Sequence, residues 1–294
     1  MGEWVSEGSN KFCYYLNGNK SRLEAKKVIL KKGVKSRDIF VPNEEGKKYF
    51  KKLIPALDSI FESSKIVDIS HGFVKGRGAV SNSKCHLGFN VGIQLDIQDF
   101  FPNITVNHLR NFLPERILDV CFIEDRLPQG LPTSPIISNI AMIYVDAKIN
   151  GMLYNLVAKG EIESYSHTRY ADDITISISL SKDRLNVNGF RPGLSSSVLY
   201  RKERYELKEI YLSILERIKL NVEEILIQSN LALHPKKTKY DFAYQGNRII
   251  TGVSLGKKNI QVSRKVKRKL RAAIHQSNVG SSLGLMAWVS QHKS

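Results

Sequence analysis

The chain has 294 residues, 42% of them hydrophobic, which is enough to bury a substantial core in one large domain or two. Lysine and arginine outnumber aspartate and glutamate by 45 to 28, and the formal net charge of +17 indicates a polyanionic partner, most often nucleic acid. No apolar run approaches the roughly 18–20 residues that cross a bilayer, so we expect no membrane association. Three widely separated cysteines without CxxC spacing favour a reducing cytoplasm over a disulfide framework or a zinc site.

Basic residues concentrate between residues 19 and 38, just before a short predicted strand that ends at Pro42. Any one of them can be a solvated surface charge, but together they indicate an electropositive wall. Asn43, followed by two acids, predicts the start of a helix that reaches Phe61, with a kink or a break at Pro55. The bases of this stretch are Lys20, Arg22, Lys26, Lys27, Lys31, Lys32, Lys35 and Arg37.

A glycine-rich basic loop follows at residues 71–78, where Lys75 and Arg77 alternate with three glycines. Such a loop is typical of backbone that runs close to phosphates, although many are ordinary turns. Asn82 and His86 come next. We interpret His86 either as a structural hydrogen-bonding histidine or as an RNA contact.

A strand with period-two alternation is predicted over residues 91–97, and it carries an acid near its end. Because Asp96 is costly to desolvate there, it should be paired or bind a cation. After a turn at residues 100–102 we expect a helix over residues 108–113. The turn-forming run from Leu127 then predicts a buried helix with Ser134 as its N-cap, continuing to Ala147.

Two adjacent acids, Asp172 and Asp173, lie between two runs of strand-like sequence. Residues 174–180 alternate isoleucine or leucine with threonine or serine, which predicts a half-buried strand. The acids therefore sit at the tip of a hairpin, with Arg169 as the nearest base. Acids are common in turns, but adjacent like charges favour a bound cation.

The last third of the chain predicts mostly helix. An irregular connection over residues 181–204 precedes a long amphipathic helix over residues 207–226. We expect a hairpin whose strands hold residues 240–242 and 248–253, with its turn at residues 246–247. A strongly basic helical segment follows from Ser263, with a domain boundary near residues 254–258.

Asp96, Asp172 and Asp173 converge if their two strands are neighbours in one sheet. Convergent carboxylates on a basic protein suit two Mg²⁺ ions, which prefer oxygen ligands. Two such ions can stabilise the attacking and leaving oxygens of an in-line phosphoryl displacement. A polymerase needs this arrangement, whereas a simple nucleic-acid binder gains nothing from acids beside phosphates.

Three segments, in order, resemble the motifs of reverse transcriptases. Residues 170–173 resemble the YxDD box, residues 95–102 the first catalytic strand, and residues 127–135 with Asn139 the QG-x-x-x-SP box. The resemblance covers roughly residues 35–260. It implies an α+β right-hand polymerase with fingers, a palm built on an antiparallel sheet backed by helices, and a small helical thumb. We expect the N-terminal segment and fingers in residues 1–90, the palm in 91–255 with fingers residues near 111–135, and the basic thumb in 256–294.

Within that family the chain is most similar to bacterial retron reverse transcriptases. Residues 71–77, the run Asn82-Ser83-x-x-His86 and the run Ile250-Thr251-Gly252 resemble retron segments, although Ser83 replaces the usual alanine and Ile250 the usual valine. The resemblance implies a cytoplasmic bacterial enzyme that copies a cognate structured non-coding RNA, used as template and primer, into cDNA. Synthesis from an RNA 2′-hydroxyl would yield branched RNA-linked single-stranded DNA (msDNA). A role in anti-phage defence with a separately encoded effector is also implied.

Two alternative functions are compatible with the same residues. A group II intron-like, diversity-generating or CRISPR-associated reverse transcriptase would carry the same three motifs. A non-catalytic RNA-binding palm protein is a further alternative, against which the presence of all three acids argues.

The resemblance also implies roles for individual residues. Asp96 and Asp172 match the principal catalytic metal ligands, Asp173 contributes less directly, and Ile97 offers its backbone carbonyl to Mg²⁺, for which Mn²⁺ can substitute. For the incoming dNTP, the matching residues are Arg37 and Lys35 at the triphosphate, Phe101 under the sugar, Gln129 at the nucleotide, and Lys237 near the leaving pyrophosphate, with Lys236 competing for that role. Phe101 can instead be core, and Gln129 a loop hydrogen bond. Expected primer or template contacts are Tyr170, Thr251, Gly252, Lys265 and Arg268, and further RNA contacts are Lys75, Arg77, Asn82 and His86.

Overall fold

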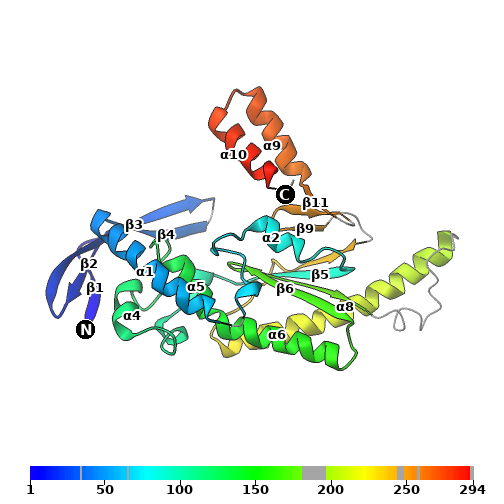
Figure 1. Ribbon diagram of the computed structural model, residues 1–294, viewed down its shortest axis with the longest axis horizontal. Helices are drawn as coiled ribbons and strands as arrows, with labels where there is room; N and C mark the ends of the chain where they lie inside the picture. The colour runs from blue at the N-terminus through cyan, green and yellow to red at the C-terminus, as the bar shows by residue number, and fades with distance from the viewer. Residues whose placement is uncertain (34, 65, 181–196, 244–247, 257–258, 292–294) are drawn as a thin grey trace.

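The computed structural model describes residues 1–33, 35–64, 66–180, 197–243, 248–256 and 259–291. An N-terminal sheet lies at one end of the molecule, a central sheet with its helices forms the body, and a pair of C-terminal helices extends away from it (Figure 1). None of the described helices is long and apolar enough to cross a membrane.

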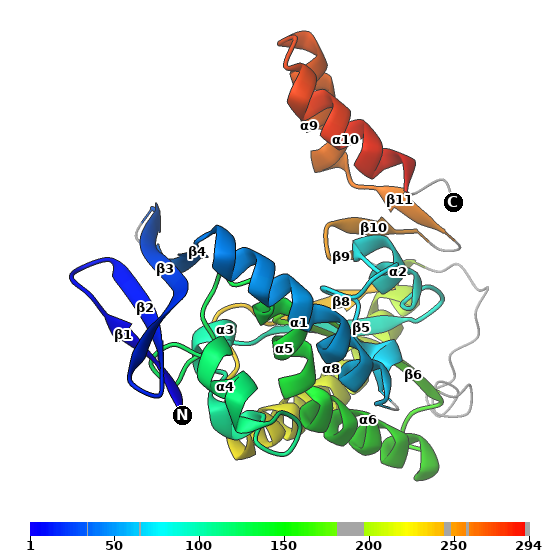
Figure 2. The same cartoon turned by 60° about the vertical axis from the view of Figure 1, so that its left-hand side comes forward.

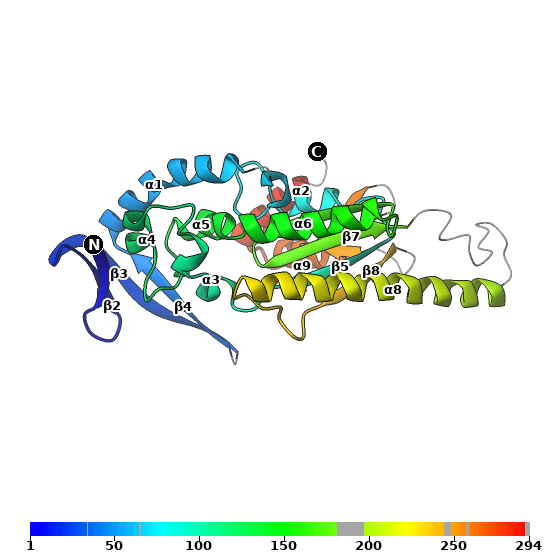
Figure 3. The same cartoon turned by 90° about the horizontal axis from the view of Figure 1, so that it is seen from below.

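The central sheet is antiparallel and has the strand order β6-β7-β5-β8. Its strands are β5 (Val91–Asp96), β6 (Ser164–Tyr170), β7 (Asp173–Ser179) and β8 (Lys239–Phe242). Helices α6 (Ile143–Ala158) and α8 (Ser197–Gln228) run along one face of it (Figure 3), and α5 (Ser134–Ala141) leads into α6. The hydrophobic core lies between this sheet and these helices.

Strand β7 is buried on both faces, whereas its alternation predicted a half-buried strand. Ile174, Ile176 and Ile178 face the helices, and Thr175 and Ser177 are also buried. The short helix α2 (Ala79–Lys84) and the residues after it cover the polar face, as Figure 1 shows above the sheet. Hydroxyls on the second face therefore mark hydrogen-bonded packing rather than solvent exposure.

The N-terminal sheet pairs β1 (Gly2–Ser6), β2 (Lys11–Leu16), β3 (Asn19–Lys32) and β4 (Lys35–Pro42) in chain order. The basic stretch is thus mostly one long strand, which the sequence analysis did not predict. Asn43 caps α1 (Glu44–Glu62) by accepting a hydrogen bond from the Gly46 amide at 2.8 Å, as predicted. The helix continues through Pro55 to Glu62, so of the expected kink or break the break is excluded, and the kink stays a prediction.

Two predicted helices differ in the structure. Residues 106–113 form the 3-10 turn η2 (Val106–His108) and further turns, and the α-helix α4 (Glu115–Cys121) begins only after Pro114. Proline favours the first position of a helix over its interior, which explains this shift. The helix predicted over residues 134–147 is divided at Met142 into α5 and α6. The remaining short elements are α3 (Phe100–Asn103) and the 3-10 turn η1 (Val67–Ile69).

The predicted hairpin between residues 240–242 and 248–253 was wrong. Strand β8 pairs with β5, whereas β9 (Arg248–Ile250) pairs with β10 (Val253–Leu255) and β10 with β11 (Ile260–Val262). The expected turn at residues 246–247 lies outside the described residues. The turn between β9 and β10 in this third sheet consists of Thr251 and Gly252, both at positive φ, as a two-residue type I′ hairpin loop requires.

The chain ends in α9 (Arg264–His275) and α10 (Val279–Ser290), which pack on each other and project from β11 (Figure 2). Lys265 and Arg268 are exposed on α9. The third sheet contacts α2, although α2 precedes it by more than 160 residues. The domain divisions near residues 90 and 255 stay a prediction.

Candidate active site

The three predicted acids meet at one end of the central sheet. Strands β5 and β7 are antiparallel neighbours, and Asp96 lies directly opposite Asp173. Tyr170 and Asp173 pair across a turn that contains Asp172, and the Ile97 amide donates to the Asp172 carbonyl at 2.9 Å. Ala171, in the same turn, has a φ of 57°, a conformation that is uncommon without glycine. The convergence that the sequence predicted is therefore present in the backbone.

Negative charge accumulates at this end of the sheet. Burial raises the pKa of Asp172, and the neighbouring Asp96 raises it further. Burial together with the charges of Asp172 and Asp96 raises the pKa of Asp173 to about 6. Carboxyl groups that resist ionisation in this way favour a nearby cation.

Lys237 forms an ion pair with Asp96, whereas Arg169, the nearest base in the sequence, pairs with Asp146. The Lys237 ammonium donates to both Asp96 carboxylate oxygens, at 2.6 and 2.7 Å. Residues 233–234, just before Lys237, are held beside the end of β5. The His234 amide donates to the Asp96 carbonyl at 2.8 Å, and Leu233 forms an isolated β-bridge with Ile97. Lys236 is exposed, and its backbone amide donates to the His234 ring at 3.2 Å.

The donor set fits a divalent cation in chemistry. Three carboxylates and the Ile97 carbonyl are hard oxygen ligands of the kind that Mg²⁺ prefers. Within the described residues, however, no three acid, histidine or cysteine side chains are grouped as metal ligands. Lys237 engages both oxygens of Asp96, one of the three acids.

Three of the expected nucleotide residues, Lys35, Arg37 and Gln129, lie on two segments that are joined by their backbones. The Phe40 amide of β4 donates to the Gln129 carbonyl at 2.7 Å. Gly130 has a φ of 111°, and a Cβ there would lie 2.5 Å from the Phe40 carbonyl, so only glycine permits this approach. Arg37 is exposed further along β4, and the Lys35 side chain lies outside the described part of the structure.

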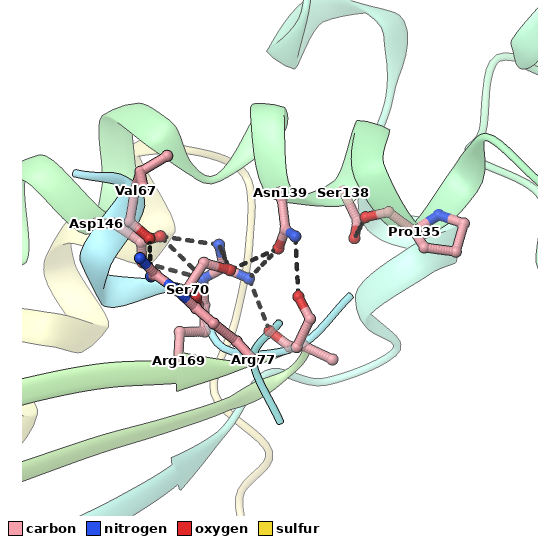
Figure 4. A network of polar contacts seen from close by, with 10 residues as sticks. Val67, Ser70, Arg77, Pro135, Ser138, Asn139, Asp146 and Arg169 are labelled. Atoms are coloured by element: carbon pink, nitrogen blue, oxygen red, sulfur yellow. Dashed lines mark hydrogen bonds and ion pairs between the residues drawn. The ribbon is translucent and has the colours of Figure 1, made fainter. Parts of the chain in front are cut away.

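A buried polar network holds the turn over residues 170–173 (Figure 4). Arg169 and Asp146 form an ion pair at 2.9 Å, with side chains 0% and 2% exposed. The Arg169 guanidinium also donates to the Ala171 carbonyl and to the Asn139 side chain, both at 3.1 Å. The Asn139 amide donates to the Gly72 carbonyl at 2.9 Å and accepts from Ser70. These bonds connect the turn to α5, to α6 and to residues 70–72.

Sequence reasoning missed the roles of Asp146 and Gly72 in this network. The available signal was an acid within an apolar helical run, together with an arginine on a strand that reaches the motif. A buried charge requires a partner of opposite charge, so the acid predicts a basic partner and the arginine an acidic one. Nothing in the sequence shows that Asp146 and Arg169 are partners of each other.

Asp146→Ala should lower the free energy of unfolding by about 3–5 kcal/mol, because it leaves the Arg169 charge buried without its partner. Urea denaturation followed by circular dichroism measures this loss. Arg217→Ala is the matched control: its ion pair with Glu161 is largely exposed, so the loss should be below about 1 kcal/mol. Equal losses in the two variants would contradict the importance of the buried pair.

The two segments that resemble retron proteins contact each other. The Asn82 amide donates to the Thr251 hydroxyl at 2.6 Å, and the Ser83 hydroxyl donates to the Ile250 carbonyl at 2.8 Å. Arg248 donates to the His86 carbonyl. Residues far apart in the sequence thus fix the β9–β10 turn onto the central sheet.

This packing buries two of the four expected RNA contacts, Asn82 and His86. Asn82 and His86 are fully buried, and the His86 ring lies between the hydroxyls of Ser177 at 2.9 Å and Thr168 at 2.7 Å. Their side chains do not reach the surface, which favours the structural alternative for His86. Arg77 binds Asp68 and the carbonyls of Val67 and Ser70, whereas Lys75 is exposed.

The buried His86 should make stability depend on pH. Burial lowers its pKa from 6.5 to about 3, so its contribution is fully present above pH 6.5 and is lost as the pH falls toward 3. The unfolding free energy should fall by about 1.4 kcal/mol per pH unit between pH 6 and 4 on account of this group. Burial also lowers the pKa values of His71 and His167 to about 4, which adds to the slope.

His86→Gln should remove about one proton from that slope, measured by urea titrations at a series of pH values. His275→Gln, at an exposed position on α9, should keep the wild-type slope. An unchanged slope in the His86 variant would contradict the neutral, buried histidine.

Comparison with known proteins decides the family. The model of "Reverse transcriptase (RNA-dependent DNA polymerase)" matches residues 29–247. The chain belongs to the reverse transcriptase family. Members of this family use divalent metal ions, in agreement with the oxygen-rich end of the central sheet.

Among the curated proteins that this reverse transcriptase matches are bacterial retron reverse transcriptases, which supports the retron resemblance of its sequence. It is 26% identical to the Retron Mx162 reverse transcriptase of Myxococcus xanthus over 76% of this chain and 47% of that protein. It is 24% identical to the Retron Ec86 reverse transcriptase of Escherichia coli over 77% of this chain and 61% of that protein. The chain thus spans about half the length of these relatives.

A solved telomerase from Candida albicans, in complex with a telomeric RNA fragment, has a similar fold, with a TM-score of 0.51. The match covers 91% of this reverse transcriptase and 53% of that chain at 11% identity, so it concerns the fold alone. The predicted α+β right-hand polymerase architecture is confirmed.

Proposed function

We propose that this reverse transcriptase is an RNA-directed DNA polymerase that copies a cognate structured non-coding RNA into single-stranded DNA. The observation that carries the proposal is the meeting of Asp96, Asp172 and Asp173 at one end of the β5–β7 pair. The net charge of +17 and the exposed bases of α9 support binding of template and product through their phosphates, which makes binding salt-sensitive.

We assign two Mg²⁺ ions to these acids, with Mn²⁺ as a substitute. Asp96 and Asp172 are the proposed principal ligands, with the Ile97 carbonyl and Asp173 as the others. Bound there, the ions would stabilise the charge on the attacking and leaving oxygens of phosphoryl transfer. Lys237 is the proposed proton donor to the leaving pyrophosphate, and its contact with Asp96 supports it over Lys236.

The incoming dNTP is bound by the wall that β4 and the Gln129 loop form. Arg37, with Lys35, contacts the triphosphate, since guanidinium and phosphate make paired charged hydrogen bonds. Gln129 contacts the nucleotide, and Phe101 packs under its sugar. Tyr170 and the Thr251–Gly252 turn position the primer end. The bond from Asn82 to Thr251 supports this last role, because it fixes the turn.

The retron resemblance extends the proposal to priming and biology. Synthesis begins at an RNA 2′-hydroxyl and yields branched msDNA, in the bacterial cytoplasm, and a separately encoded effector joins the complex in anti-phage defence. A group II intron-like, diversity-generating or CRISPR-associated enzyme would instead release cDNA extended from a 3′-end. Purified protein treated with RNase should retain short single-stranded DNA; cDNA that carries a free 3′-extended primer would overturn the retron product.

Asp172→Asn tests the catalytic assignment. It should reduce dNTP incorporation on a primed RNA template by about a hundredfold or more, since it removes charge where the transition state needs it. RNA affinity, measured by fluorescence anisotropy, should stay within about threefold, because phosphate contacts dominate binding.

Glu209→Gln, on the exposed face of α8, is the control and should retain wild-type incorporation. Equal incorporation by Asp172→Asn and the wild type would reject the polymerase site and favour a non-catalytic RNA-binding protein.

A further inference from the structure

Phe73 is a large apolar side chain in an unusual position. It is 47% exposed, and its φ of 62° places its backbone in the left-handed region. For a bulky residue such a conformation is energetically unfavourable and persists only where the surroundings fix it. Strained residues of this kind concentrate at functional sites, so the surroundings and contacts of Phe73 are informative.

The backbone before Phe73 is packed onto the catalytic turn. The His71 amide donates to the Arg169 carbonyl at 2.8 Å. A Cβ on Gly72 would lie 2.5 Å from the Ala171 nitrogen, so the two chains are in direct backbone contact. The bond from Asn139 to the Gly72 carbonyl adds a third constraint.

The backbone after Phe73 is also fixed. Arg77 donates to the carbonyls of Val67 and Ser70, which closes the loop over residues 67–77 on itself. Val74 packs against the hydrophobic core. Phe73 is therefore held from both sides in an exposed position, and the position does not depend on burial of its own ring.

The Phe73 ring contacts Phe101, the residue proposed to pack under the nucleotide sugar. Their centroids are 6.1 Å apart and their planes are inclined by 61°, an edge-to-face geometry. Phe101 packs in turn on Phe100 at 5.5 Å, and Phe100 is buried. The three rings thus run from the core to the surface, with Phe73 at the exposed end beside the Asp172 turn.

We propose that Phe73 and Phe101 together form the apolar surface against which the deoxyribose of the incoming nucleotide packs, so that Phe73 is a second determinant of sugar selection. This inference rests on the proposed polymerase function. A ribose would bring its 2′-hydroxyl against aromatic carbon, where the hydroxyl loses hydrogen bonds to water without replacement. A deoxyribose meets the same surface without that loss.

The test measures single-nucleotide incorporation of a dNTP and of the matching rNTP by the full chain on a primed RNA template. Phe73→Ala should lower the dNTP-to-rNTP ratio of kcat/KM by about three- to tenfold, the scale of one aromatic contact. The change should arise mainly in KM for the dNTP, since the ring contacts the sugar and not the reacting phosphate. Because the ratio compares two substrates of one preparation, it does not depend on the fraction of folded enzyme.

Three further variants sharpen the test. Phe73→Tyr keeps the ring and should retain the wild-type ratio, and Tyr154→Ala removes an exposed aromatic side chain from α6 and should also leave it unchanged. In a Phe101→Ala background, Phe73→Ala should change the ratio less than it does alone, because the two rings act as one surface.

An unchanged ratio in Phe73→Ala would overturn the inference, even if total activity falls, because equal losses for both nucleotides indicate a purely structural role. That result would leave the polymerase function intact. Failure of the wild type to incorporate any dNTP would instead overturn the proposed function, and this inference with it.

Discussion

The ion pair between Arg169 and Asp146 is the constraint on which the catalytic end of the molecule depends. Two charges fully removed from water are costly, and their attraction offsets that cost only when the remaining hydrogen-bonding groups are also satisfied. Here they are satisfied by groups that belong to other elements: the carbonyl of Ala171, the side chain of Asn139 and the hydroxyl of Ser70. Breaking any one contact leaves a buried charge unsatisfied, so the four segments keep one arrangement. The contacts that satisfy the buried pair therefore also fix the position of the turn over residues 170–173.

The same logic connects the rest of the site. Backbone-to-backbone contacts, rather than flexible side chains, join β4 to the Gln129 loop and residues 70–72 to the turn, and glycine at positions 130 and 72 permits both approaches. Side chains that contact nucleotide or nucleic acid in the proposed mechanism then extend from rigid supports. Lys237 is the exception, since its long side chain reaches the acids from outside the sheet. A flexible cation suits a group that must exchange partners when other cations and phosphates arrive.

Sequence reasoning succeeded where the information is local. The alternation around residues 91–97 and 174–180, the cap at Asn43 and the paired acids are short-range patterns, and they placed the catalytic strands and their convergence correctly. It failed where long-range pairing decides. Strand β8 pairs with β5 instead of β9, and Arg169, the base nearest to the paired acids in the sequence, pairs with Asp146. The basic stretch concealed one strand of a sheet, because its lysines suggested surface charge more strongly than its alternation suggested a strand. Buried pairs such as Asp146 with Arg169 are visible in the sequence only as two unexplained charges.

The joint between the central sheet and the C-terminal helices has a mechanical consequence. The β9–β10 hairpin is held mainly through hydrogen bonds with Asn82, Ser83 and His86. Hydrogen bonds have preferred angles, so they fix the orientation of the hairpin, whereas apolar contacts mostly keep surfaces close together. Helices α9 and α10 follow β11, which pairs with that hairpin, and extend from it as a rigid arm. Helix α10 alone has 12 residues and is about 18 Å long. A rotation of about ten degrees at the joint would move its far end by about 3 Å, close to one nucleotide step along a strand. The direction in which α9 and α10 extend is therefore set at the six-residue helix α2.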